Sequence, residues 1–168
     1  MITRLWYPQL DVYDAVRRLC FLLFGCNNNS APMERLYIAD FYLANPPLLH
    51  KTSMPMSVRA HFNSIEIPKP DKTFLSYPSP PLLFHKMEPI QRKAIQAMAG
   101  RDIIDSGEFQ RGIAALSEFG SRFVETKLFV DATPQELRLI DFLVNHFVLV
   151  ANEDMLDLRR RTGLRRMA

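Results

Sequence analysis

The residues that could carry out chemistry are few in this sequence, and they lie far apart. Four histidines occur, at His50, His61, His85 and His146. No two of them have the i, i+4 spacing of a helical zinc site, and no cysteine lies at ligand spacing from any of them. The pattern predicts no metal site, and we expect each histidine to be a surface or core residue.

Motifs for phosphate binding and for nucleophilic catalysis are also absent. The 168 residues contain no Gly-x-x-x-x-Gly-Lys loop, no Gly-x-Gly-x-x-Gly fingerprint and no Gly-x-Ser-x-Gly elbow. A small hydrolase or nuclease would need a cluster of carboxylates that the sequence does not assemble. We therefore expect a chain without enzymatic activity and without a cofactor, which does not hydrolyse ATP by itself.

One carboxylate stands out, because it lies in an apolar stretch. Residues 30–44 read as a helix that Ser30 caps and Asn45 ends, and Asp40 is its only charge after Arg35. A helix that is apolar on nearly every side is a buried one. We expect Asp40 to be the buried partner of Arg35 or of another arginine.

Two groups of basic residues could contact nucleic acid or an acidic partner. The first consists of Lys51, Arg59, Lys69 and Lys72, and the second of Arg159, Arg160, Arg161, Arg165 and Arg166. In a DNA-reading winged helix the third helix enters the major groove, while basic wing residues hold phosphates. The alternatives are a winged helix that binds only protein, and a C-terminal tail that is solvated or docked on an acidic partner.

The elements that would position these residues are mostly helices. A helix from Asp11 to about Phe24 has a buried face that includes Cys20, a core thiol, whereas Arg17 and Arg18 lie off that face. The helix over 30–44 and a third over 57–65 follow. Residues 73–77 and 82–85 read as two strands joined by a proline turn. Three helices and a hairpin predict a winged-helix-like part over residues 1–86.

The second half predicts a helical part over residues 87–168, packed on the first to give one compact, mainly α unit. Its first helix covers residues 88–99, with Pro89 in the first turn. Thr133 and Glu136 form a capping box, and the helix behind it reaches about Ala151. The polar stripe of that helix is narrow, so we expect an exposed apolar patch that binds a partner. The candidate interface residues are Phe142, Phe147, Leu149 and Val150.

Composition limits the class of protein. The formal net charge is only +3, which permits nucleic-acid contact without requiring it. The two cysteines do not form a secreted disulfide framework. No apolar run approaches the roughly 18 residues that a membrane span needs, and no signal pattern opens the chain. We expect a cytoplasmic protein with no membrane contact.

Three segments give the sequence a family resemblance. They are Met-Ile-Thr-Arg-Leu-Trp-Tyr-Pro-Gln-Leu-Asp-Val-Tyr-Asp-Ala at residues 1–15, Arg-Leu-Tyr-Ile-Ala-Asp-Phe-Tyr-Leu-Ala-Asn-Pro-Pro-Leu-Leu-His at 35–50, and Phe-Leu-Ser-Tyr-Pro-Ser-Pro-Pro-Leu-Leu-Phe-His-Lys-Met-Glu-Pro-Ile-Gln at 74–91. From Met1 to about Leu116 the chain resembles the middle component of bacterial ABC-three-component systems, which are Lamassu-like conflict operons. The resemblance carries no catalytic signature.

This resemblance implies a function in a protein complex. The chain would be an accessory subunit that links an SMC-like ABC ATPase to an effector such as a nuclease, in defence against phage or plasmids. It would contact DNA through the complex. The alternative reading is a winged-helix DNA-binding transcription regulator.

Overall fold

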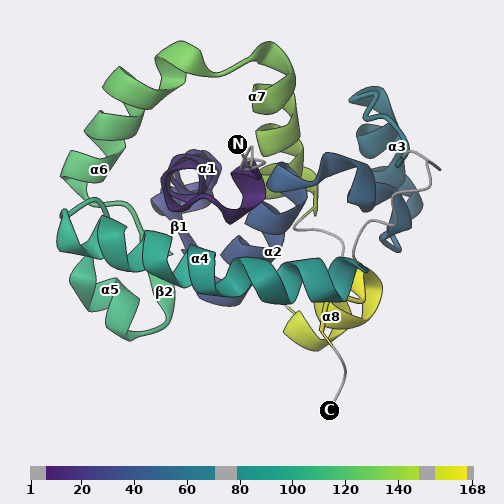
Figure 1. Ribbon diagram of the computed structural model, residues 1–168. Helices are drawn as coiled ribbons and strands as arrows, with labels where there is room; N and C mark the ends of the chain where they lie inside the picture. The colour runs from purple at the N-terminus through teal and green to yellow at the C-terminus, as the bar shows by residue number, and fades with distance from the viewer. Residues whose placement is uncertain (1–6, 71–78, 148–153, 166–168) are drawn as a thin grey trace, which may run out of the picture.

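The computed structural model describes residues 7–70, 79–147 and 154–165. Helix α1 (Val12–Gly25) lies at the centre of the molecule, and Figure 1 looks almost along its axis. Around it lie α2 (Met33–Ala44), α4 (Pro80–Gly100) and the segment from α6 (Glu118–Phe123) to α7 (Pro134–Asp141). Helix α3 (Met56–Ser64) lies at the edge of the molecule, and α8 (Met155–Thr162) lies beside α4. The fold is mainly α, as predicted.

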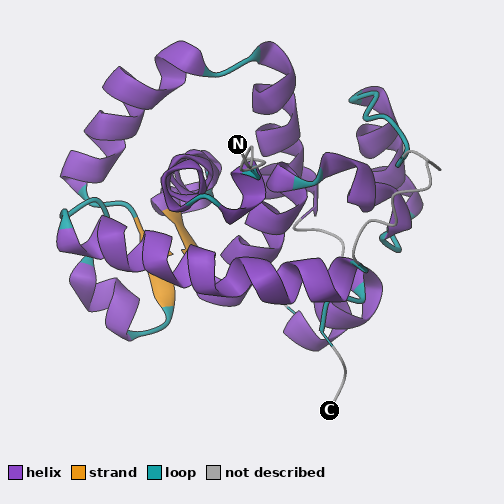
Figure 2. Cartoon of the chain, in the orientation of Figure 1, coloured by secondary structure: helices purple, strands orange, loops and turns teal. Residues whose placement is uncertain are grey.

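Short elements connect these helices. The 3-10 turns are Pro8–Leu10, Asn27–Asn29, Pro46–Lys51 and Phe129–Asp131, and α5 spans Ser106–Gln110. Two π-helical turns, Val124–Leu128 and Phe142–His146, follow α6 and α7 directly. Figure 2 shows how little strand the described chain contains. Among the described residues, no helix is both long and apolar enough to cross a membrane.

The first helix forms where the sequence predicts it. The Asp11 carboxylate accepts hydrogen bonds from the backbone N–H groups of Tyr13 (2.8 Å) and Asp14 (3.0 Å), which caps α1. Cys20 is fully buried and forms no disulfide, which confirms it as a core thiol. The position predicted for Arg18 is wrong, because this side chain is 2% exposed and lies inside the fold.

Helix α2 is the buried helix that the sequence predicts, although it starts three residues later. Every residue from Leu36 to Leu43 is buried, and Asn45 closes the helix by donating from Nδ2 to the carbonyl of Phe41 at 2.9 Å. Ser30 is not its cap. Residues Ser30–Pro32 form strand β1, which pairs antiparallel with β2 (Ile113–Ala115), so the backbone there is extended.

The predicted wing is not confirmed. Residues 73–77 lie outside the described residues, and the predicted returning strand over 82–85 is wrong because it belongs to α4. Proline in a first helical turn loses no hydrogen bond, so Pro80 and Pro81 open a helix instead of a hairpin. Helix α4 buries Leu83, Phe84 and Met87 on one face. Pro89 lies inside this helix, and residue 86, the predicted boundary between the two parts, falls within it.

The helix predicted behind Thr133 is less regular than the sequence suggests. The Thr133 hydroxyl accepts a hydrogen bond from the N–H of Glu136 at 3.2 Å, so the predicted cap is confirmed. The helix does not continue regularly, because α7 ends at Asp141 and gives way to the π-helical turn Phe142–His146.

A buried ion pair joins α1 to α2. The Arg18 guanidinium donates to both carboxylate oxygens of Asp40, from Nε at 2.7 Å and from Nη2 at 3.3 Å, and its Nη1 also contacts Asp14. From α4, the Gln91 amide donates to Asp40 at 2.8 Å and to the carbonyl of Tyr37 at 3.0 Å. Burial favours the neutral form of Arg18, but the charges of Asp40 and Asp14 raise its pKa. The prediction of an arginine partner for Asp40 is confirmed, and the partner is Arg18.

The first prediction concerns this ion pair. In the Asp40→Asn variant, Arg18 loses its buried counter-charge, and we expect the free energy of unfolding to fall by about 3 kcal/mol. Urea denaturation followed by circular dichroism measures the change. The matched control is Glu118→Gln, which removes the carboxylate of the exposed pair between Glu118 and Arg122. Equal stability of the two variants would contradict the central role of Asp40.

Candidate interaction surface

The C-terminal arginines lie against carboxylates of the same chain. Arg159 donates from Nε to Glu34 at 2.7 Å, and Arg165 donates from Nε to the same carboxylate at 3.0 Å. Arg165 also pairs with Glu88, and its guanidinium carbon lies 5.3 Å from the centre of the Phe84 ring. Hydrogen bonding to Arg159 holds the pKa of Glu34 below its ordinary value. These contacts tie α8 to the start of α2 and to α4.

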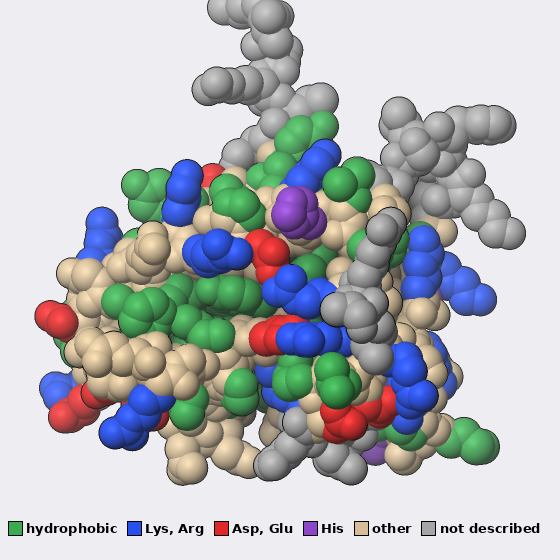
Figure 3. Space-filling model, turned by 90° about the horizontal axis from the view of Figure 1, so that it is seen from below, with side chains coloured by type: hydrophobic (Ala, Val, Ile, Leu, Met, Phe, Trp, Pro, Cys, Tyr) green, Lys and Arg blue, Asp and Glu red, His purple; other side chains and the backbone are tan. Residues whose placement is uncertain are grey.

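The next two arginines are paired within α8 itself. Arg161 donates to Asp157 at 2.7 Å, and Arg160 contacts the same carboxylate. Arg166 lies outside the described residues. Figure 3 shows basic and acidic side chains next to one another in the middle of the face seen from below. The described arginines of this tail therefore pair with carboxylates of their own chain, an arrangement that the sequence interpretation did not consider.

The residues of the other predicted basic group differ in their exposure to solvent. Lys51 and Lys69 are exposed, whereas Arg59 is half-buried. The Arg59 guanidinium donates to the carbonyl of Thr52 at 2.6 Å and lies 5.6 Å from the centre of the Phe62 ring. Lys72 lies outside the described residues. Arg59 therefore holds the start of α3 in place, and its guanidinium is engaged by the chain itself.

The predicted apolar patch is wrong for the two residues that the structure describes. Phe142 is 1% exposed and Phe147 is 4% exposed. The ring centre of Phe142 lies 5.7 Å from that of Phe62 on α3, and the ring centre of Phe147 lies 5.4 Å from that of Tyr42 on α2. The prediction assumed that one side of a regular helix must face solvent, but α3 and α2 cover these rings. Leu149 and Val150 lie outside the described residues.

The structure brings together two histidines that are distant in the sequence. The rings of His61 and His146 stack with their centres 3.9 Å apart and their planes 20° apart. His61 Nδ1 lies 2.9 Å from the carbonyl of Ser57, and His146 lies 3.9 Å from the carboxylate of Asp141. Among the described residues, no group of three or more histidine, cysteine or carboxylate side chains is placed to hold a metal ion.

A groove of about 1000 Å³ runs between α1, α2 and the π-helical turn that follows α7. Its described lining is mostly apolar and consists of Leu22, Cys26, Asn27, Ser30, Ala31, Pro32, Arg35, Leu36, Ala39, Leu143, Val144, Phe147 and Met155. The small side chains of Ser30, Ala31 and Ala39 leave space between the larger ones. Arg35 is the one charged residue of this lining. The lining of this groove is therefore suited to apolar side chains.

Sequence reasoning did not find this groove. Its walls come from three separate stretches of chain, around residues 22–39, 143–147 and 155. Each stretch, taken alone, reads as ordinary core. The available signal was the pair of alanines, Ala31 and Ala39, in a segment that otherwise carries large side chains. Alanine is a common core residue, so this signal does not distinguish a groove from a filled interior.

One of the two cysteines, Cys26, lines the groove, so its reactivity reports on how accessible the groove is. Burial raises the pKa of its thiol to about 11, although the nearby charge of Arg35 acts in the opposite direction. Burial alone raises the pKa of Cys20 to about 12. Only the thiolate is nucleophilic, so both thiols stay protonated and unreactive at neutral pH.

The second prediction follows from these pKa shifts. At about pH 8 we expect Cys26 to react with Ellman's reagent about 100-fold more slowly in the folded chain than in urea, and Cys20 about 1000-fold more slowly, since the thiolate fraction falls tenfold with each unit of raised pKa. Below the ordinary pKa of 9.0 the thiols stay neutral, and Cys26 ionises only as the pH approaches about 11. Fast reaction of either thiol in the folded chain would show that burial does not control it.

Comparison with known proteins places the whole chain in one family. Residues 4–167 match the family model described as ABC-three component (ABC-3C) system Middle Component 5. No curated protein and no solved structure matches the chain. The match covers nearly every residue, including the α2 helix with its buried Asp40, the basic tail and all three walls of the groove. The chain therefore belongs to the Middle Component 5 family of ABC-three-component systems.

Proposed function

We propose that this protein is a non-catalytic accessory subunit that links an ABC-type ATPase of the SMC-like kind to an effector protein. Membership of the Middle Component 5 family carries this proposal, because a middle component belongs to a multi-protein system and so has partner proteins. The remaining parts of such a system must supply the ATPase and the effector chemistry. We further propose that the complex works in the cytoplasm against phage or plasmid DNA.

The apolar groove is the surface that we assign to a partner subunit. An apolar segment of that subunit matches the groove in polarity, because the described lining is mostly apolar. Burial of a few apolar side chains at the centre of an interface typically supplies most of its binding energy. The groove is therefore a better docking surface than the Arg159 and Arg165 side chains, which are already paired with Glu34.

The third prediction tests the assembly. When a tagged form of this chain is expressed together with its neighbouring genes, we expect it to co-purify with an ABC-type ATPase. The Met155→Glu variant places a charge at the groove and should lose the partner. Leu156→Glu is the matched control, because the adjacent Leu156 is 58% exposed and does not line the groove. Urea denaturation of each isolated variant shows whether the fold survives.

Three results would contradict the proposal. The wild-type chain could purify alone when its neighbours are present. Folded Met155→Glu and Leu156→Glu variants could retain the partner equally, which would remove the groove as the docking surface. The purified chain could cleave nucleic acid or hydrolyse ATP in a reaction that a single carboxylate substitution abolishes, and the protein would then be an enzyme.

The fourth prediction replaces the interface role that the sequence suggested for Phe147. Because Phe147 packs against Tyr42 inside the fold, Phe147→Asp should unfold the isolated chain, with a loss of about 3 kcal/mol or more. Circular dichroism of the purified variant measures the loss of helix. A folded variant that fails to bind its partner would restore the original interpretation of Phe147 as an interface residue.

A further inference from the structure

Helix α4 has an outer face that carries only positive charge. The helix spans Pro80–Gly100, and at 1.5 Å per residue it is about 31 Å long. Its exposed residues recur at helical spacing and include Leu82, His85, Lys86, Pro89, Arg92, Lys93, Gln96, Ala97 and Gly100, with Arg101 directly after the last turn. We call Lys86, Arg92, Lys93 and Arg101 the α4 stripe.

The charges of the α4 stripe are not neutralised by neighbouring groups. None of its four residues forms an ion pair within the part of the chain that the structure describes. The single carboxylate within α4, Glu88, is 7% exposed and is engaged by Arg165. The exposed Asp102 follows Arg101 without pairing with it.

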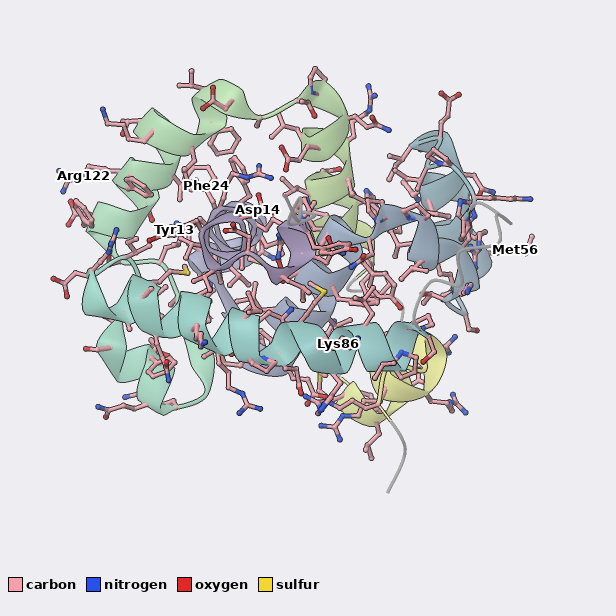
Figure 4. The ribbon with its side chains drawn as sticks, in the orientation of Figure 1. Tyr13, Asp14, Phe24, Met56, Lys86 and Arg122 are labelled. Atoms are coloured by element: carbon pink, nitrogen blue, oxygen red, sulfur yellow. The ribbon has the colours of Figure 1, made fainter. Side chains whose placement is uncertain are left out.

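Several other arginines with at least partly exposed side chains do have ion-pair partners. Arg17, Arg111, Arg122 and Arg160 each pair with a carboxylate of the chain. The net charge of +3 is modest, yet among the described residues α4 carries several exposed cations that have no ion-pair partner. Figure 3 shows basic side chains spread across the upper part of the face seen from below, over α4, and Figure 4 labels Lys86 on this helix.

The composition of this face favours a polyanion over a folded protein. Protein interfaces have an apolar core from which charges, and lysine in particular, are depleted. Apart from Leu82 at one end, the exposed side chains between the cations are small or polar. The stripe runs from Lys86 to Arg101, which at 1.5 Å per residue is about 22 Å, a length that spans several phosphates of a duplex. Long lysine and arginine side chains on such a rod can reach successive phosphates.

We propose that the α4 stripe binds the phosphate backbone of duplex DNA without reading its sequence. Arginine and lysine can contact guanine as well as phosphate, but the exposed Pro89, Ala97 and Gly100 between them offer no hydrogen-bonding side chain to base edges. Positioning on the backbone is therefore the role that the residues fit best. The proposal does not depend on which proteins the chain joins, because it concerns contacts made by this chain alone.

The fifth prediction is measured by fluorescence anisotropy of the full chain with a labelled duplex of about 20 base pairs, two helical turns. The logarithm of affinity is followed against the logarithm of salt between about 50 and 200 mM. The triple variant Lys86→Gln, Lys93→Gln and Arg101→Gln removes three exposed contacts. We expect its slope to shrink by about 2.7, since each lost phosphate contact contributes about 0.9.

A matched triple variant controls for net charge. Lys51→Gln, Lys69→Gln and Arg138→Gln removes the same residue types from exposed positions elsewhere. The control should bind DNA with nearly the slope of the unmodified chain, and circular dichroism should show that both triple variants are folded. The stripe variant should also still co-purify with partner proteins, which separates this result from the test of assembly.

Four outcomes would overturn the proposal. The unmodified chain could fail to bind duplex DNA at the lowest salt. The two triple variants could lose equal slope, which would indicate attraction by net charge alone. The stripe variant could be unfolded while single substitutions of Lys86 and Lys93 leave the slope unchanged. The chain could bind poly-glutamate of equal charge more tightly than DNA, which would identify an acidic protein as the partner of α4.

Discussion

The ion pair between Arg18 and Asp40 constrains the whole architecture. A buried charge is tolerated only when it is paired and hydrogen-bonded, so α1, α2 and α4 must approach closely enough for Arg18, Asp40 and Gln91 to meet. This requirement adds a directional constraint to the apolar packing of the three helices. The outer face of α4 and the groove beside α2 then occupy defined positions because their buried faces are held.

The described basic residues of this protein fall into two groups, those paired with a carboxylate of the chain and those without such a partner. Arginines that pair with carboxylates stabilise the fold, as Arg159 and Arg165 do at Glu34. Within residues 7–70, 79–147 and 154–165 the cations of the α4 stripe have no such partner, which is why we propose an external anion for them. The groove adds an apolar surface of different character. The proposed contacts with a partner subunit and with DNA would use these two surfaces separately, since they lie on different parts of the chain.

Sequence patterns predicted those parts of the fold that local chemistry decides. The Asp11 and Thr133 caps, the buried α2 helix and the pairing of Asp40 with an arginine all follow from residue types at short range. Prolines misled the prediction, because Pro80 and Pro81 suit a turn and a helix start equally. The burial of Phe142 and Phe147 could not be predicted, since it depends on α3 and α2, which approach them from distant sequence positions.

The docking of α8 has a consequence for the order in which the protein becomes complete during synthesis. Arg18 and Asp40 are 22 residues apart, so their contact can form once the first two helices have left the ribosome. Glu34 is separated by 125 and 131 residues from its partners Arg159 and Arg165. The carboxylates of Glu34 and Glu88 therefore stay unpaired with Arg165 until that residue has left the ribosome. Before then, the nascent chain has two acidic groups on or beside α4 that are neutralised in the finished protein.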